Sequence, residues 1–252
     1  MSDFDLASFD EQGYWIARGL MDPLGCNKMR AHVEKILDPL QGPAEFESDV
    51  GYQGAPTSRH VEGGNTPRRL LNAFSRAPLF ADWATSRAIT EPLQQMIGTD
   101  EVSLSQCHHN CVMTKMPGYS SETMWHQDIR YWSFDQPELV SVWLALGEEG
   151  PQNGGLLVIP GSHRLELDRG RLDKDLFLRQ ELEENRALID TAVPVSLSPG
   201  DVLFFHCRVF HAAGMNRTDA TKISVVFTYH GGDNVPIPGT RSASYPSIPL
   251  PE

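Results

Sequence analysis

The chain has 252 residues, of which 40% are hydrophobic and 21% charged, so it can bury a sizeable core and is too apolar to be disordered. Its formal net charge of −12 argues against a nucleic-acid partner, and no apolar run reaches the ~18 residues needed to span a membrane. The four cysteines are too few for a disulfide scaffold and no secretory signal is visible, so we expect free thiols and a cytoplasmic location.

The first hundred residues carry helical patterns. Asp22 and Pro23 form a typical helix start, and apolar residues then recur at helical spacing as far as Leu40. A second helical stretch is predicted over about 79–97, interrupted or restarted near Pro92. The segment of about 41–67 between them is rich in Gly, Pro and polar residues, which predicts a loop.

From Glu101 onward, short β-type runs alternate with turn signals such as Pro117-Gly118. The runs are VSLSQC, NCVMTKM, ELVSVWLAL, GLLVIP, AVPVSL, DVLFF and KISVVFTY. The charged segment 164–191 is predicted to be a solvated helix in a surface insertion, and the tail 231–252 to lie extended on the surface. We expect one domain over 1–252, mainly β with flanking helices, with a helical part over about 1–100 and a barrel or sandwich over about 101–230.

The most informative stretch is Trp125-His126-Gln127-Asp128. Side chains two apart on a strand point the same way, so His126 and Asp128 can reach one metal ion, and a third ligand can come from His206 or His211. Two histidines and one carboxylate leave positions open on the metal, as in non-haem Fe(II) oxygenases. A zinc hydrolase can use the same residue types, so both chemistries stay open at this point.

Several segments together resemble the phytanoyl-CoA dioxygenase family of Fe(II)/2-oxoglutarate oxygenases, over nearly the whole chain. They are FDEQGYWIARGLMDP, KMPGYSSETMWHQDIRYW, VWLAL, NGGLLVIPGSHR and GDVLFFHCRVFHAAGMNRT. The resemblance implies a double-stranded β-helix, which is a cupin-like jelly-roll barrel with the metal at one mouth. It also implies Fe(II), 2-oxoglutarate as co-substrate and O₂.

Position by position, the resemblance makes His126, Asp128 and His211 the metal ligands and catalytic centre, which leaves His206 in the core or beside the site. Trp143 matches an aromatic residue that lines the 2-oxoglutarate site. The related halogenases have Gly or Ala in place of Asp128, so its presence favours hydroxylation over halogenation.

The family usually places an arginine eleven residues after the distal histidine, where this chain has Lys222. Lysine brings charge without the bidentate fork of arginine. We expect Lys222 to anchor the far carboxylate of 2-oxoglutarate, with Ser224 or Thr114 adding a hydrogen bond and Arg217 as a fallback. Ala213 replaces a hydroxyl residue that is common in the family.

The run from Cys107 to Cys111, CHHNC, does not offer the paired ligands of a structural zinc site. Core cysteines and a pocket-lining histidine or asparagine are the favoured interpretation. In the family this strand faces the barrel interior, so Asn110, Met113 or Lys115 is expected to touch the co-substrate.

Arg130 continues the alternation of His126 and Asp128 and would suit an anionic group on a substrate. The other residues expected near the substrate are Tyr131, His108 and Arg68. We expect hydroxylation of an unactivated C–H bond of a small polar metabolite, an anionic one included, with release of succinate and CO₂. The alternatives are a metal-dependent hydrolase with the same triad and a catalytically silent family member that binds ligand.

Overall fold

The computed structural model describes residues 4–251, so the ends of the predicted domain, residues 1–3 and 252, lie outside it. The larger of its two sheets has eight antiparallel strands in the order β1-β9-β6-β11-β4-β3-β2, with β12 paired to β4. Their bounds are β1 (Tyr14–Ala17), β2 (Ala44–Phe46), β3 (Pro67–Leu71), β4 (Val102–Lys115), β6 (Leu139–Ala145), β9 (Val202–His206), β11 (Lys222–Gly231) and β12 (Ile248–Pro249).

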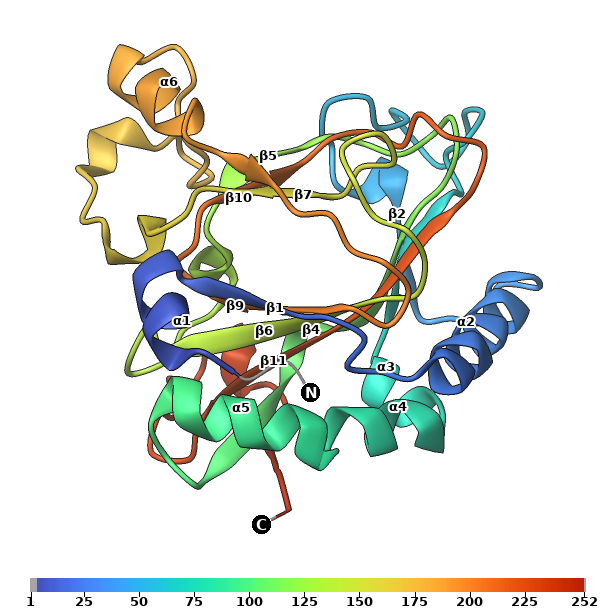
Figure 1. Ribbon diagram of the computed structural model, residues 1–252. Helices are drawn as coiled ribbons and strands as arrows, with labels where there is room; N and C mark the ends of the chain where they lie inside the picture. The colour runs from blue at the N-terminus through green and yellow to red at the C-terminus, as the bar shows by residue number, and fades with distance from the viewer. Residues whose placement is uncertain (1–3, 252) are drawn as a thin grey trace.

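The smaller sheet has four antiparallel strands in the order β5-β10-β7-β8 and faces the larger one (Figure 1). Its strands are β5 (Thr123–His126), β7 (Leu156–Val158), β8 (Val193–Pro194) and β10 (His211–Ala213). An apolar core that includes Trp143, Leu203 and Phe205 fills part of the space between the sheets. The predicted jelly-roll is confirmed; within residues 4–251 the two sheets are not joined by strand pairing into a closed barrel.

Helices cover the face of the large sheet that points away from the small one (Figure 1). These helices are α1 (Leu6–Gln12), α2 (Pro23–Leu37), α3 (Ala73–Arg76), α4 (Pro78–Ala84) and α5 (Arg87–Ile97), whereas α6 (Glu183–Ile189) lies beside the small sheet. The carboxylate of Asp22 accepts from Leu24 N and Gly25 N, which confirms the predicted start of α2. None of the helices over residues 4–251 has both the length and the apolar character that a bilayer crossing demands.

Several boundaries differ from the sequence predictions. The break in the second helical stretch falls at residues 85–86, where Ser86 is extended, and Pro92 lies inside α5. The two runs VSLSQC and NCVMTKM form one strand, β4. The strand continues between them because its register with β11 is irregular opposite Phe227 and Thr228 and because His108 has a left-handed backbone conformation (φ 63). The predicted loop 41–67 contains β2 and a short 3₁₀ helix, Glu47–Asp49.

Segment 164–191 is not the solvated helix that its charge pattern predicts. It contains two 3₁₀ turns (Ser162–Arg164 and Arg169–Arg171), a bridge between Leu172 and Leu178, and only the short helix α6. Phe177 and Leu178 are buried, and Leu178 N donates to Trp125 O on β5. The tail also differs from the prediction, because β12 pairs with β4 and Ser242 is buried.

Candidate active site

His126 and His211 meet across two neighbouring strands of the small sheet. His126 ends β5, His211 begins β10, and the two residues are direct partners in the antiparallel register. Asp128 is not on the strand, as the alternation argument assumed, because β5 stops at His126 and Asp128 opens a 3₁₀ helix, Asp128–Tyr131. The turn nevertheless brings the carboxylate back to the two imidazoles.

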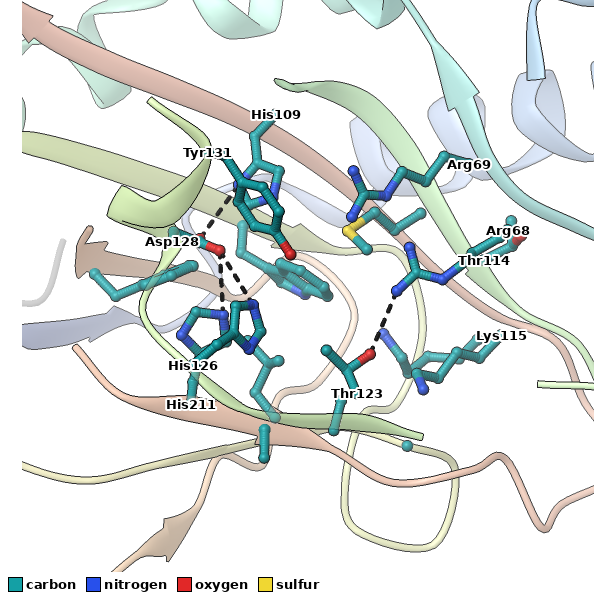
Figure 2. Close-up of a pocket in the computed structure, with 18 of the residues that line it drawn as sticks. Arg68, Arg69, His109, Thr114, Lys115, Thr123, His126, Asp128, Tyr131 and His211 are labelled. Atoms are coloured by element: carbon teal, nitrogen blue, oxygen red, sulfur yellow. Dashed lines mark hydrogen bonds and ion pairs between the residues drawn. The ribbon is translucent and has the colours of Figure 1, made fainter. Parts of the chain in front are cut away.

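The three side chains form one compact buried cluster (Figure 2). The Nε2 atoms of His126 and His211 lie 3.5 and 3.4 Å from Asp128 Oδ1. One ligand atom from each residue lies within 4.8 Å of the other two. This is the spacing of side chains that can converge on one metal ion.

Backbone carbonyls set the tautomer of both histidines. His126 Nδ1 donates to Met124 O at 2.8 Å, and His211 Nδ1 donates to Val209 O at 3.0 Å. A proton on Nδ1 leaves a lone pair on Nε2, which is the atom that faces Asp128 in both residues. Metal-binding histidines are commonly oriented in this way.

The surroundings favour a neutral His126 and an ionised Asp128. Burial, followed by the nearby charge of His211, lowers the pKa of His126 to about 4, so this ring is neutral. Burial alone would raise the pKa of Asp128, but His109 and His211 hold it well below its usual range. Burial would lower the pKa of His211, but the Asp128 carboxylate raises it, so a metal ion that binds here must displace the proton of this ring.

The environment of the Asp128 carboxylate indicates a metal site. Both of its carboxylate oxygens are buried and have no hydrogen-bond partner. Leaving a buried carboxylate without hydrogen bonds is costly, and a cation between the three side chains would remove the cost. Two imidazole nitrogens and a carboxylate suit Fe(II), so the residues present fit the ion that the sequence resemblance implies.

The cluster lies at one end of a pocket whose other end is strongly basic. Figure 2 shows His126, Asp128 and His211 on one side and Arg68, Arg69 and Lys115 across from them. The pocket-lining residues that the sequence had singled out are His126, Asp128, His211, Trp143, Met113, Thr114, Lys222, Tyr131, Arg68, Lys115 and Ala213, and the structure adds Arg69. Predicted ligand and co-substrate groups therefore share one cavity.

Other predicted residues point elsewhere. Asn110 Oδ1 accepts from Phe74 N, so this side chain faces the helical layer. His108 packs on Tyr131 and Trp132 outside the pocket lining. Arg130 was expected to continue the strand alternation of His126 and Asp128, but β5 ends at His126. The Arg130 guanidinium stacks on Phe177, 3.9 Å from the ring centroid. Arg217 is exposed.

Lys222 reaches the pocket but is already paired. Its Nζ lies 3.1 Å from Glu149 Oε2 and 3.0 Å from Ser224 Oγ, while Ser224 Oγ donates to Glu149 Oε1 at 2.7 Å. Trp143 Nε1 also donates to the Glu149 carboxylate. Three of the groups predicted to receive the co-substrate thus bind a carboxylate of the protein itself. No sequence signal pointed to Glu149, because GEEGPQNG has the composition of an ordinary polar turn.

His109 is a pocket-lining residue that the sequence suggested only in general terms. Its Nδ1 lies 3.3 Å from Asp128 Oδ2. Cys107 and Cys111 are free and buried, as are Cys26 and Cys207, which confirms the expected free thiols in the structure.

Comparisons with known proteins agree with this geometry. The sequence model of the phytanoyl-CoA dioxygenase (PhyH) family matches residues 9–224. Peroxisomal phytanoyl-CoA dioxygenase of Homo sapiens is 29% identical over 241 residues, covering 89% of this chain and 67% of that protein. Ectoine dioxygenase of Sphingopyxis alaskensis is 26% identical over 245 residues, covering 90% and 75%.

Two solved structures share the fold. EctD from S. alaskensis, solved with 2-oxoglutarate and 5-hydroxyectoine, has a TM-score of 0.75 at 23% identity and covers 94% of this chain and 78% of that chain. The non-haem alpha-ketoglutarate-dependent carbocyclase SnoK from nogalamycin biosynthesis has a TM-score of 0.76 at 18% identity, covering 100% and 97%. The residues that the family model matches, 9–224, include His126, Asp128 and His211.

Proposed function

The chain belongs to the phytanoyl-CoA dioxygenase family, and from that premise we propose that it hydroxylates an unactivated C–H bond of a small polar metabolite. It is an Fe(II)- and 2-oxoglutarate-dependent oxygenase, with O₂ as oxidant. The observation that carries the proposal is the buried carboxylate of Asp128, left without hydrogen bonds between two oriented imidazoles.

We assign His126, Asp128 and His211 to the iron. Three protein ligands leave coordination positions for the 2-oxo acid and O₂, and the bound metal supplies the redox chemistry. The carbonyls of Met124 and Val209 keep the two imidazoles aimed at the ion, so the protein orients the ligands before the metal arrives.

The pocket supports a polar substrate. Arg68 and Tyr131 line it, and Thr123 Oγ1 lies 3.3 Å from Arg68 Nη2, so donors are available to a hydroxyl or carboxylate group. We assign Arg68 and Tyr131 to the substrate side, while Trp143, Met113 and Thr114 line the space for the co-substrate.

The test is a panel of small polar metabolites assayed for substrate-stimulated succinate release with Fe(II), 2-oxoglutarate and O₂. We expect one compound class to raise succinate formation and to gain an oxygen atom from isotopically labelled O₂. The His126→Ala variant should show no release, whereas His60→Ala, at an exposed loop position, should match the wild type. Product formation that continues without O₂ would instead indicate hydrolysis, and absence of any 2-oxoglutarate turnover in the wild type would indicate a silent binding protein.

A further inference from the structure

The cations at the basic end of the pocket differ in whether a protein carboxylate neutralises them. Lys222 is paired with Glu149, and the two side chains are only 2% and 1% exposed. Arg68 and Arg69 lie 3.1 and 3.4 Å from Glu45, and Arg68 is also 3.9 Å from Glu47. These three residues therefore enter the pocket with their charge at least partly balanced.

Lys115 is different. No carboxylate among residues 4–251 lies within 4.0 Å of its Nζ, which instead donates to Ser121 O at 2.7 Å and Gly214 O at 2.6 Å. The ammonium is more enclosed than the side chain as a whole, which is only partly buried. Gly154 (φ +76) makes room for the stem, because a Cβ there would lie 2.5 Å from Lys115 Cδ.

The register places Lys115 opposite Lys222, which stands where the family usually has an arginine. It is the direct partner of Lys222 across β4 and β11, and both line the pocket. The charged groups that face it are Lys222, Arg68, Glu47 and Glu122. Burial, followed by repulsion from Lys222, lowers the pKa of Lys115 to about 7, so an incoming anion would relieve an unfavourable interaction.

We infer that Lys115, and not Lys222, is the residue that receives the distal carboxylate of 2-oxoglutarate. The inference rests on the proposed function, since it assumes that the other end of the 2-oxo acid binds the metal held by the triad. Lys222 then has a different role: with Glu149 it forms a neutral buried pair that closes the position where the family usually has an arginine.

The experiment measures binding without turnover. Wild type, Lys115→Met and the double variant Lys222→Met/Glu149→Leu are loaded with Mn(II) in the absence of O₂, and each is titrated with 2-oxoglutarate and with pyruvate by calorimetry. Pyruvate lacks the distal carboxylate and so reports on the metal end alone. The double variant is the matched control, because it removes both charges of the pair and leaves no buried ion without a partner.

We expect Lys115→Met to weaken 2-oxoglutarate binding by about 10- to 100-fold, the range for losing one charged hydrogen bond, and to leave pyruvate binding unchanged. The double variant should stay within about threefold of wild type. Thermal unfolding and Mn(II) affinity, measured on each variant, show whether the fold and the triad are intact.

Three other results would overturn the inference, and the first also uses an Arg69→Met variant that is titrated in the same way. A loss of 2-oxoglutarate affinity confined to the double variant, or to Arg69→Met, would move the anchor to that residue and leave the proposed function standing. If the metal-loaded wild type binds Mn(II) but neither 2-oxo acid, the proposed function itself fails. A Lys115→Met protein that binds 2-oxoglutarate normally but unfolds at lower temperature would make Lys115 a structural tie between the 121 and 214 loops.

Discussion

The imidazoles of His126 and His211 differ from other buried histidines in what their Nε2 atoms meet. His206 Nε2 lies 2.9 Å from Glu138, and His230 Nε2 lies 2.7 Å from Ser247 Oγ, so both rings are satisfied within the protein. In the triad, the Nε2 atoms face a carboxylate that also lacks hydrogen bonds. Sequence resemblance could choose His211 over His206, but only the coordinates show this physical difference.

Lys115 gives a pH-dependent prediction for the ligand-free protein. Its pKa is lowered from 10.5 to about 7 in the folded state, mainly by burial. Between these values the unfolded chain holds a proton that the folded chain lacks, so stability rises with pH, by at most about 1.4 kcal/mol per pH unit. The difference in free energy of unfolding between wild type and Lys115→Met, from urea titrations at pH 7, 8 and 9, should follow this slope; parallel curves for the two proteins would contradict it.

The buried pair of Lys222 and Glu149 predicts a strong coupling. Glu149→Leu leaves the Lys222 ammonium buried without its carboxylate, which should cost about 3–5 kcal/mol of unfolding free energy. Adding Lys222→Met should recover much of this loss, because the second charge is removed as well. A double-mutant cycle by denaturant titration measures the coupling, and additive losses would show that the two groups act independently.

At the scale of elements, the site depends on how short strands are held in place. β10 has only three residues, and the residue before it, Phe210, donates its backbone N–H to Ser162 Oγ at 2.8 Å. Ser162 Oγ in turn donates to Ile159 O at 2.6 Å. One buried hydroxyl therefore links the end of β7 to the start of β10, immediately beside His211.

Replacing that hydroxyl tests whether it positions the ligand strand. Ser162→Ala leaves the buried Phe210 N–H without an acceptor, which should cost about 1–3 kcal/mol. Metal affinity should fall as well, because the path of β10 at His211 loosens. Calorimetric Mn(II) titration and thermal unfolding give the two readouts, with the exposed Ser75→Ala in α3 as the control. A loss of stability with unchanged metal affinity would restrict Ser162 to a structural role.

Element types were predictable where local chemistry fixes them and not where tertiary contacts do. The Asp22 cap and Pro23 predict the start of α2 because the signal lies within a few residues. The prediction that Asp128 lies beside His126 at one metal site is confirmed. The strand alternation on which it was based is wrong, because β5 ends at His126 and the sequence does not show this boundary. The many charged residues of segment 164–191 predicted a solvated helix, so the burial of Phe177 was not expected. Phe177 is buried where it forms a β-bridge with the distant His126.

For the whole molecule, the predicted class and layer arrangement hold because seven β-type runs after a helical region allow few architectures. What the sequence could not give was the division of the interior into two cores on opposite faces of the large sheet. All residues of β6 and β11 are buried, and their side chains alternate between the two sides of the large sheet, so no exposed strand face marks the side that holds the site.

The two cores predict a separation between stability and metal binding. Phe80 on α4 is fully buried in the helical core, so Phe80→Ala should cost about 3–5 kcal/mol of unfolding free energy. Mn(II) affinity at low temperature, where the variant is folded, should stay near the wild-type value, because the large sheet separates Phe80 from the triad. Denaturant titration and calorimetry measure the two quantities, and a matching fall in both would show that the layers are coupled.

The two ligand histidines share a local arrangement: each ring is tied to the carbonyl two residues before it, at Met124 and at Val209. The orientation of each imidazole on its own strand is thus set within a tripeptide, whereas the position of β10 also depends on the contact with Ser162. We expect that the same two tripeptides, placed on adjacent antiparallel strands of another scaffold, would orient two histidines in the same way. Because these hydrogen bonds are local, substitutions elsewhere in the cavity leave the orientation of the two metal-binding imidazoles unchanged.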